Sequence, residues 1–157
     1  MVDVREAKAR DLAALADLMA ASPLLVRYGV TRAGALKWLE DALGHGDVLL
    51  MARGDGDPAP SGLAWLQRLR GFGGAAYLRL LLVAEDHQGR GLGARLLAAA
   101  EQRAAVWSRH MLLLTTADNH AARRFYERHG YQCAGQLERL ILPDADELLY
   151  HKVLPPA

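Results

Sequence analysis

Residues 76–109 read AYLRLLLVAEDHQGRGLGARLLAAAEQRAAVWSR, and the rest of the chain is organised around this stretch. Its apolar run, Tyr77–Val83, has the length of a buried strand and stops at three polar residues, Glu85-Asp86-His87. Beyond them, leucines and alanines recur at helical spacing from Leu92 onward. The sequence therefore predicts a strand, a short loop and a long helix in direct succession.

Glycines stand where the loop turns into the helix, in the segment QGRGLG at residues 88–93. Glycine permits backbone angles and close approaches that a Cβ atom would block. The first-turn N–H groups have no partner within the helix, and the helix dipole adds partial positive charge at the same end. The segment therefore predicts a binding site for an anion, most often a phosphate.

The same glycines also satisfy the dinucleotide-binding pattern G-x-G-x-x-G/A, as Gly89-x-Gly91-x-x-Ala94, with Asp118 after the next predicted strand. That pattern expects the strand to run directly into the first glycine within a βαβ unit. Here residues 84–88 intervene, and the preceding chain reads as consecutive strands. Both differences count against a nicotinamide or flavin site.

Composition narrows the classes of protein. With 157 residues, 52% of them hydrophobic, we expect a single domain over residues 1–157. The net charge of +1 gives no electrostatic case for nucleic acid or an anionic membrane. The single cysteine, Cys133, excludes an internal disulfide, and the six histidines lack metal-ligand spacing. We therefore expect no metal, no nucleic acid and no membrane partner.

The amino terminus does not resemble a targeting segment. Asp3, Arg5 and Glu6 are unlike a signal peptide, and no apolar run approaches the roughly 20 residues that span a bilayer. Together with the cysteine usage, this predicts a cytoplasmic protein.

Periodicity and turn residues assign the other elements. Strands are expected at residues 1–7, 48–52, 62–69, 111–116, 131–142 and 147–154, and helices at 9–21, 31–43 and 119–129. Residues 24–30 read as an apolar connector, Thr31 as an N-cap, and Gly130 as a left-handed residue that ends the last helix.

A second signature, NHAARRFYERHGY, spans residues 119–131. Asn119 and Tyr126 are seven residues apart, so about 700° of helical turn places them nearly on one face. One side of this helix can therefore offer an amide near its start and a phenol two turns later. The simpler interpretation is an N-cap and a buried aromatic whose hydroxyl is hydrogen-bonded.

The pattern Gln88-x-x-Gly91-x-Gly93, with the second signature roughly 30 residues later, resembles the GNAT superfamily of N-acyltransferases. The order of elements is similar to that family over nearly the whole chain, although Tyr131 replaces a final phenylalanine of the second signature. The resemblance implies an α+β GNAT fold with a mixed, mostly antiparallel sheet of about seven strands and about four helices on its two faces.

The resemblance also implies a function. A GNAT N-acetyltransferase transfers the acetyl group of acetyl-CoA to a primary amine of a small molecule or peptide, by direct attack in a ternary complex. A longer acyl-CoA donor is the alternative within the enzyme class, and a catalytically silent CoA-binding module is the alternative outside it. A homodimer is left open.

Site residues follow from the resemblance by position. Those expected to hold the cofactor are Leu82, Val83, Gln88, Gly89, Arg90, Gly91, Leu92, Gly93, Ala94, Asn119, Ala122 and Tyr126. A backbone N–H at Leu82 or Val83 would face the oxygen that becomes negative. Tyr126 would protonate the leaving thiolate as the general acid.

The general base is not assigned by the resemblance. A lysine-like amine has a pKa of about 10.4, so presenting it neutral at pH 7 costs roughly 4.6 kcal/mol, and a base is expected. Some family members carry a glutamate where this chain has Tyr77, and Arg79 on the same strand face cannot act as a base. The candidates are Glu138, His120 and an ordered water that relays the proton to either of them.

The acceptor side is expected opposite the cofactor. In the family it is lined by the connector between the first two helices and by the last two strands, which places Arg27 and Tyr28 on one side. The other side carries carboxylates, at Glu138, Asp144, Asp146 and Glu147. They would favour a cationic amine, and the alternative interpretation is a solvated turn.

Overall fold

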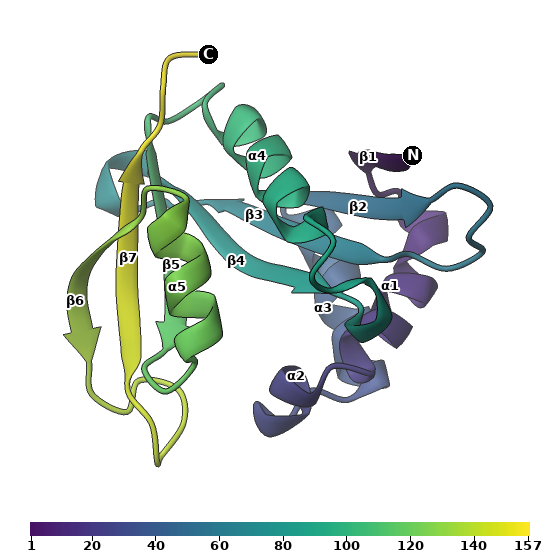
Figure 1. Cartoon of the computed structure of the whole chain (residues 1–157), viewed down its shortest axis with the longest axis horizontal. Helices are drawn as coiled ribbons and strands as arrows, with labels where there is room; N and C mark the ends of the chain where they lie inside the picture. The colour runs from purple at the N-terminus through teal and green to yellow at the C-terminus, as the bar shows by residue number, and fades with distance from the viewer. The chain divides into compact units, whose positions relative to one another are not determined.

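The computed structural model describes all 157 residues and contains seven strands and five α-helices (Figure 1). In chain order they are β1 Val2–Glu6, α1 Leu12–Ala20, α2 Pro23–Arg27, α3 Arg32–Gly44, β2 Val48–Gly54, β3 Gly62–Arg68, β4 Ala76–Val83, α4 Leu92–Ala104, β5 His110–Thr116, α5 His120–Arg128, β6 Gln132–Leu137 and β7 Glu147–Val153. Three 3₁₀ turns are η1 Ala9–Asp11, η2 Phe72–Gly74 and η3 Glu85–His87.

The strands form one sheet in the order β1-β2-β3-β4-β5-β7-β6. β4 and β5 are parallel, whereas β1–β2, β2–β3, β5–β7 and β6–β7 pair in antiparallel register. This mixed, mostly antiparallel sheet with its helices confirms the predicted fold. None of the helices is long and apolar enough to cross a lipid bilayer.

The chain divides into two compact units. The first comprises residues 1–66 and 80–100, and the second comprises residues 67–79 and 101–157. β4 and α4 contribute to both units, so the strand–loop–helix stretch supplies residues to each. The expectation of a single domain over residues 1–157 stays a prediction.

The first unit is a layered core with helices on both faces of β2 and β3. Alternation along the strands turns one set of side chains toward α1 and α3. This set and its helical partners form one buried cluster that includes Leu15, Met19, Leu39, Leu49, Met51, Leu63 and Trp65.

The other face of β3 carries the start of α4 at very close range. A Cβ atom at Gly62 would lie 2.6 Å from Leu96 Cδ1 and 2.9 Å from the Leu82 carbonyl oxygen. The buried Leu96 side chain and the Leu82 carbonyl oxygen occupy the space that a side chain at Gly62 would need, whereas Leu92 Cδ2 would lie in ordinary contact at 3.7 Å. Glycine at this position therefore sets how closely α4 approaches β3 and the end of β4.

In the second unit, polar contacts tie the end of α4 and α5 to β7. Tyr150 is fully buried and donates a hydrogen bond from its hydroxyl to Glu127 Oε1 at 2.8 Å. Glu101 accepts from Lys152 Nζ at 2.9 and 3.0 Å and from the Tyr131 hydroxyl at 3.0 Å. These contacts hold α5 in place over the strands of this unit.

Two predictions about the irregular segments are wrong. The connector predicted at residues 24–30 contains helix α2, because Ser22 Oγ accepts from the Leu25 N–H at 3.4 Å and Pro23 starts the helix, where its missing N–H costs nothing. The strand predicted at residues 131–142 ends at Leu137. It ends there because Arg139 has a left-handed φ of 45° and donates its backbone N–H to Asp146 at 3.0 Å.

Candidate active site

The segment after β4 is held at both of its ends by hydrogen bonds. The Ala84 N–H donates to the Ser61 carbonyl at 2.9 Å, which ties the end of β4 to the start of β3. Four residues later, Gln88 Nε2 donates back to the Val83 carbonyl at 3.2 Å. Turn η3 lies between these two anchors and delivers the chain to residues 88–94, which we call the glycine loop.

The glycine loop presents main-chain donors. The first hydrogen bond within α4 runs from the Arg95 N–H to the Gly91 carbonyl at 3.2 Å. The N–H groups of Leu92, Gly93 and Ala94 therefore have no acceptor within the helix. Arg90 and Arg95 are exposed beside them and add positive charge.

Two glycines keep the approach to these donors open. Gly89 has φ 74° and Gly91 has φ 78°, values that other residues rarely adopt. No atom lies within 4 Å of the position that a Cβ would take at either glycine. Bare N–H groups, a helix dipole and flanking arginines suit an anion such as a diphosphate.

The end of β4 distinguishes between Leu82 and Val83 as backbone donors. Alternate N–H groups of an extended strand point to the same side. Because the Ala84 N–H points to β3, the Leu82 N–H points there too, whereas the Val83 N–H points to the opposite edge of β4. Val83 is therefore the better candidate of the two for an oxyanion donor.

Helix α5, in the second unit, carries the two polar residues of the second signature. Asn119 is the N-cap, because its Oδ1 accepts from the Ala122 N–H at 3.1 Å. Its Nδ2 makes no hydrogen bond within the protein. The capping role and the predicted cofactor contact are thus compatible, since they use different atoms of one amide.

Tyr126 is buried with an unpaired hydroxyl. The residue is 8% exposed, and its ring packs edge-on against the rings of Phe125 and Tyr131, with centroids 5.2 and 5.6 Å away. No hydrogen bond within the protein involves its hydroxyl, and this oxygen is not one of the fully buried polar atoms that lack a partner. Burial raises the pKa of the Tyr126 phenol well above its ordinary value, so the hydroxyl keeps its proton at neutral pH. A protonated, unpaired phenol is the state a general acid requires.

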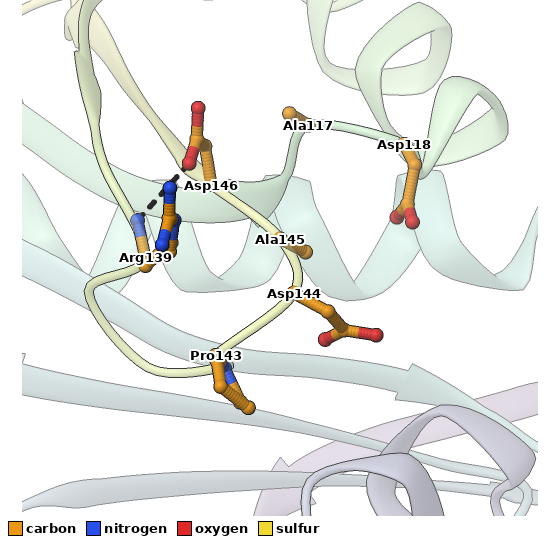
Figure 2. A pocket seen from close by; sticks show the side chains of 7 residues that line it. All are labelled: Ala117, Asp118, Arg139, Pro143, Asp144, Ala145 and Asp146. Atoms are coloured by element: carbon orange, nitrogen blue, oxygen red, sulfur yellow. Dashed lines mark hydrogen bonds between the residues drawn. The ribbon is translucent and has the colours of Figure 1, made fainter.

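An open acidic pocket of about 460 Å³ lies beside α5 in the same unit (Figure 2). Its lining residues are Ala117, Asp118, Arg139, Pro143, Asp144, Ala145 and Asp146. Figure 2 shows the carboxylates of Asp118 and Asp144 turned to the same side of the β6–β7 loop. Sequence reasoning named Asp144 and Asp146 for the acceptor but did not give Asp118 this role.

Asp146 has a structural part within this loop. It accepts from Gln136 Nε2 at 2.5 Å and from the Arg139 N–H at 3.0 Å, and these hydrogen bonds hold its pKa below the ordinary value. The contacts of Gln136 and Arg139 with Asp146 were not predicted from the sequence. At Arg139 the reason is its left-handed backbone, which has no sequence signature at an arginine. Of the acidic side chains predicted for the acceptor, Asp144 is therefore the one whose carboxylate is exposed at the pocket without holding the loop.

The remaining predicted residues lie elsewhere. Glu138 is 77% exposed and pairs with Arg139 at 3.3 Å, and neither it nor His120 lines the acidic pocket. Arg27 and Tyr28 end α2 in the first unit. Tyr77 is half-buried, and burial raises the pKa of its phenol, so it offers no base in place of the family's glutamate.

The family of the chain follows from a match to a family model. The model of the acetyltransferase (GNAT) family matches residues 13–131, which is most of the chain. The protein therefore belongs to the GNAT acetyltransferase family, as the two signatures predicted. No curated protein gives a significant match to the sequence.

Solved structures share the fold. A candidate GNAT acetyltransferase from Desulfovibrio desulfuricans has a TM-score of 0.81 at 21% identity, with 99% of this chain and 100% of that chain covered. The ribosomal-protein-S18-alanine N-acetyltransferase from Escherichia coli has a TM-score of 0.79 at 20% identity, with coverages of 100% and 96%. The candidate acetyltransferase yncA from Salmonella typhimurium, solved with its cofactor acetyl-CoA, has a TM-score of 0.78 at 20% identity, with coverages of 100% and 96%.

Proposed function

We propose that the protein is an N-acetyltransferase that uses acetyl-CoA and acts on a cationic primary amine. The observation that carries the proposal is the row of N–H groups at Leu92, Gly93 and Ala94, which have no acceptor within the helix. The glycines before them have no side chain that could cover these groups. In a chain of the GNAT acetyltransferase family, this row is suited to the diphosphate of coenzyme A.

The residues that would hold the cosubstrate are the ones predicted by position. The main chain at Leu92–Ala94 would bind the diphosphate, and Arg90 would add charge, while Gln88 fixes the loop to Val83. From the second signature, Asn119 Nδ2 and the backbone near Ala122 would add polar contacts. When bound, acetyl-CoA supplies an acetyl group already activated as a thioester.

Two groups of the chain would act on the reacting atoms. The Val83 N–H would donate to the oxygen that becomes negative as the amine attacks, a contact that is stronger in the transition state than before it. Tyr126 would donate its proton to the departing sulfur, since its phenol is protonated at neutral pH. Glu138, His120 or an ordered water stays the predicted base.

The acidic pocket supports a cationic acceptor. The exposed carboxylates of Asp118 and Asp144 would attract an ammonium group before it loses its proton (Figure 2). Two structural neighbours are ribosomal-protein-alanine N-acetyltransferases, so a peptide amino terminus belongs among the acceptors tested. A primary amine as the acceptor and a cytoplasmic location stay predictions, and a homodimer stays open.

Turnover with a panel of amines tests the proposal. Purified protein is given acetyl-CoA with peptides, polyamines and amino sugars, free thiol is followed by its colour reaction, and the acetylated product is identified by mass. We expect thiol release that depends on the amine. Binding of coenzyme A without turnover on any amine would instead favour the catalytically silent CoA-binding module, and faster turnover with a longer acyl-CoA would identify a different donor.

A further inference from the structure

The connection between β3 and β4 is a closed tip that carries an exposed aromatic ring. Its ends are joined by a hydrogen bond from the Leu69 N–H to the Ala75 carbonyl at 3.0 Å. Inside the tip, the Gly74 N–H donates to the Gly71 carbonyl at 3.1 Å. Phe72, within turn η2, is 74% exposed. The tip therefore presents a phenyl ring to solvent on a backbone that is held by its own hydrogen bonds.

The backbone of Phe72 is left-handed. Its φ is 52°, a region that is strained for an aromatic residue and relaxed for glycine. Because the ring is exposed, burial of apolar surface does not compensate for this strain. The three glycines of the tip leave the ring unobstructed, since no atom lies within 4 Å of a Cβ built at residue 71, 73 or 74. A strained and exposed aromatic residue is the kind of outlier that indicates a binding role.

Two arginines of the tip have no partner within the protein. Arg68 ends β3 and Arg70 follows two residues later, and both are exposed. Neither makes a hydrogen bond or an ion pair with another residue. The exposed Arg109 lies at the same end of the sheet, because Ala76 at the start of β4 is opposite Met111 at the start of the parallel β5. Three guanidinium groups therefore surround the start of β4.

Charge is segregated within this second unit. The segments that meet at this end of the sheet are residues 67–78, 102–112 and 150–154. They contain four arginines and one lysine but no aspartate or glutamate. The two carboxylates that border these segments accept hydrogen bonds, Glu101 from Lys152 and Glu127 from Tyr150. The acidic pocket lies at the other end of β5 and β7. The net charge of +1 averages over these two ends, so it does not describe the basic end.

An exposed aromatic ring among arginines has the chemistry that binds single-stranded nucleic acid. A base stacks on the ring, and guanidinium groups pair with the neighbouring phosphates. Residues 70–74 read Arg-Gly-Phe-Gly-Gly, and arginine–glycine segments are among those that bind single strands without reading their sequence. An anionic membrane would also attract the arginines, but the tip offers only one large apolar side chain for insertion into lipid.

We propose that the β3–β4 tip is a binding surface for single-stranded nucleic acid, with a base stacked on Phe72 and phosphates on Arg68, Arg70 and Arg109. The surface uses none of the residues proposed for acetyl transfer, so the inference goes beyond that function and does not depend on it. Because every base has a face that can stack, the surface does not select a base sequence.

Fluorescence anisotropy tests the inference with labelled strands of about 12 nucleotides, one of oligouridine RNA and one of oligothymidine DNA. For the unaltered protein we expect saturable binding that weakens about 20-fold between about 50 mM and about 200 mM salt, as for three phosphate contacts. Tighter binding of the RNA than of the DNA would show that the 2′-hydroxyl contributes. The double variant Arg68→Gln with Arg70→Gln should reduce the salt effect to about threefold.

Phe72→Gly separates binding from folding. It should weaken binding at least about fivefold, because the stacking ring is lost. The same change should raise the Tm, because glycine adopts the left-handed φ without strain. A ring with a purely structural role would instead lower the Tm when it is removed. Phe72→Trp should keep the binding, because indole also stacks on bases.

Matched controls are Trp38→Ala, at an exposed aromatic residue of α3, and Arg10→Gln, at an exposed arginine of η1. Both should bind the strands as the unaltered protein does. No binding of either strand, or an unchanged affinity in Phe72→Gly, would overturn the inference. If Phe72→Gly does not fold, an unchanged salt effect in the double arginine variant does so. Binding to phosphatidylglycerol vesicles in place of the strands would also overturn it and identify a lipid contact.

Discussion

The glycine loop offers main-chain groups to a ligand, whereas the region around α5 offers side-chain groups. The loop offers backbone N–H groups, and its glycines are there to keep side chains away. The α5 region offers the Tyr126 hydroxyl, the Asn119 amide and the acidic side chains of the β6–β7 loop. From this difference we expect cofactor binding to respond to bulk or charge added at the loop, and the chemical step to respond to removal of one functional group near α5.

Among the variants near α5, Tyr126→Phe is expected to have the largest effect on kcat. Removing the hydroxyl should lower kcat about 100-fold, because the thiolate then leaves without its proton donor. The Kd for coenzyme A should hardly change, because the main-chain donors of the glycine loop are intact. Stopped-flow turnover and calorimetry measure the two quantities separately.

Tyr131→Phe is the matched control for Tyr126→Phe. It removes a hydroxyl that donates to Glu101, so it should lower the Tm with little effect on kcat. Full activity in Tyr126→Phe would show that this phenol is not the acid. An equal loss in both variants would show that the effect is structural.

Gly62→Ala tests the packing that positions the glycine loop. The added Cβ would meet Leu96 Cδ1 at 2.6 Å and the Leu82 carbonyl oxygen at 2.9 Å, so the Leu96 side chain and the backbone at the end of β4 must shift. We expect the free energy of unfolding to fall by about 1–3 kcal/mol, as in other overpacked cores. We also expect a weaker affinity for coenzyme A, because the strained contacts involve α4 and the end of β4, which flank the glycine loop.

Gly71→Ala serves as the control for Gly62→Ala, since nothing lies within 4 Å of a Cβ there and its φ is negative. Urea unfolding and calorimetry compare the two variants. An unchanged stability in Gly62→Ala would contradict the close approach of α4.

Asp144→Asn should have the smallest effect. Its carboxylate is exposed, so its attraction for an ammonium group is screened, and KM for a diamine should rise by about fivefold at most. A monoamine of the same length should be affected less. Asp146 is not suitable for this test, because it holds the β6–β7 loop through Gln136 and Arg139. Equal KM values before and after the change would remove Asp144 from the acceptor site.

The sequence predicted the features that depend on the backbone conformation of a short segment. Thr31 caps α3 by accepting from the Gly34 N–H at 3.1 Å, and Gly130 ends α5 with φ 88°, both as predicted. The glycine loop belongs to the same class, because its pattern of glycines reflects backbone geometry within one short segment. Such features are visible in sequence since each needs a particular residue type at one position.

The features that were missed depend on contacts between distant residues. The acidic pocket exists because Asp146 ties Gln136 and Arg139 together across the β6–β7 loop, and the left-handed Arg139 is set by that tie. His87 Nε2 lies 3.2 Å from Asp57 Oδ2, which brings together two turns far apart in sequence. Neither arrangement has a spacing or composition that marks it in the sequence.

Calorimetric titration of coenzyme A tests the central claim most directly, with Gly91→Glu as the decisive variant. A glutamate there would place a carboxylate where the diphosphate is proposed to bind. The control is Gly46→Glu, because Gly46 has a similar φ of 79° and equally open surroundings away from the loop. We predict saturable binding by the unaltered protein and by Gly46→Glu, and an affinity at least about 100-fold weaker in Gly91→Glu. No heat from the unaltered protein, or equal affinity in Gly91→Glu, would contradict the account.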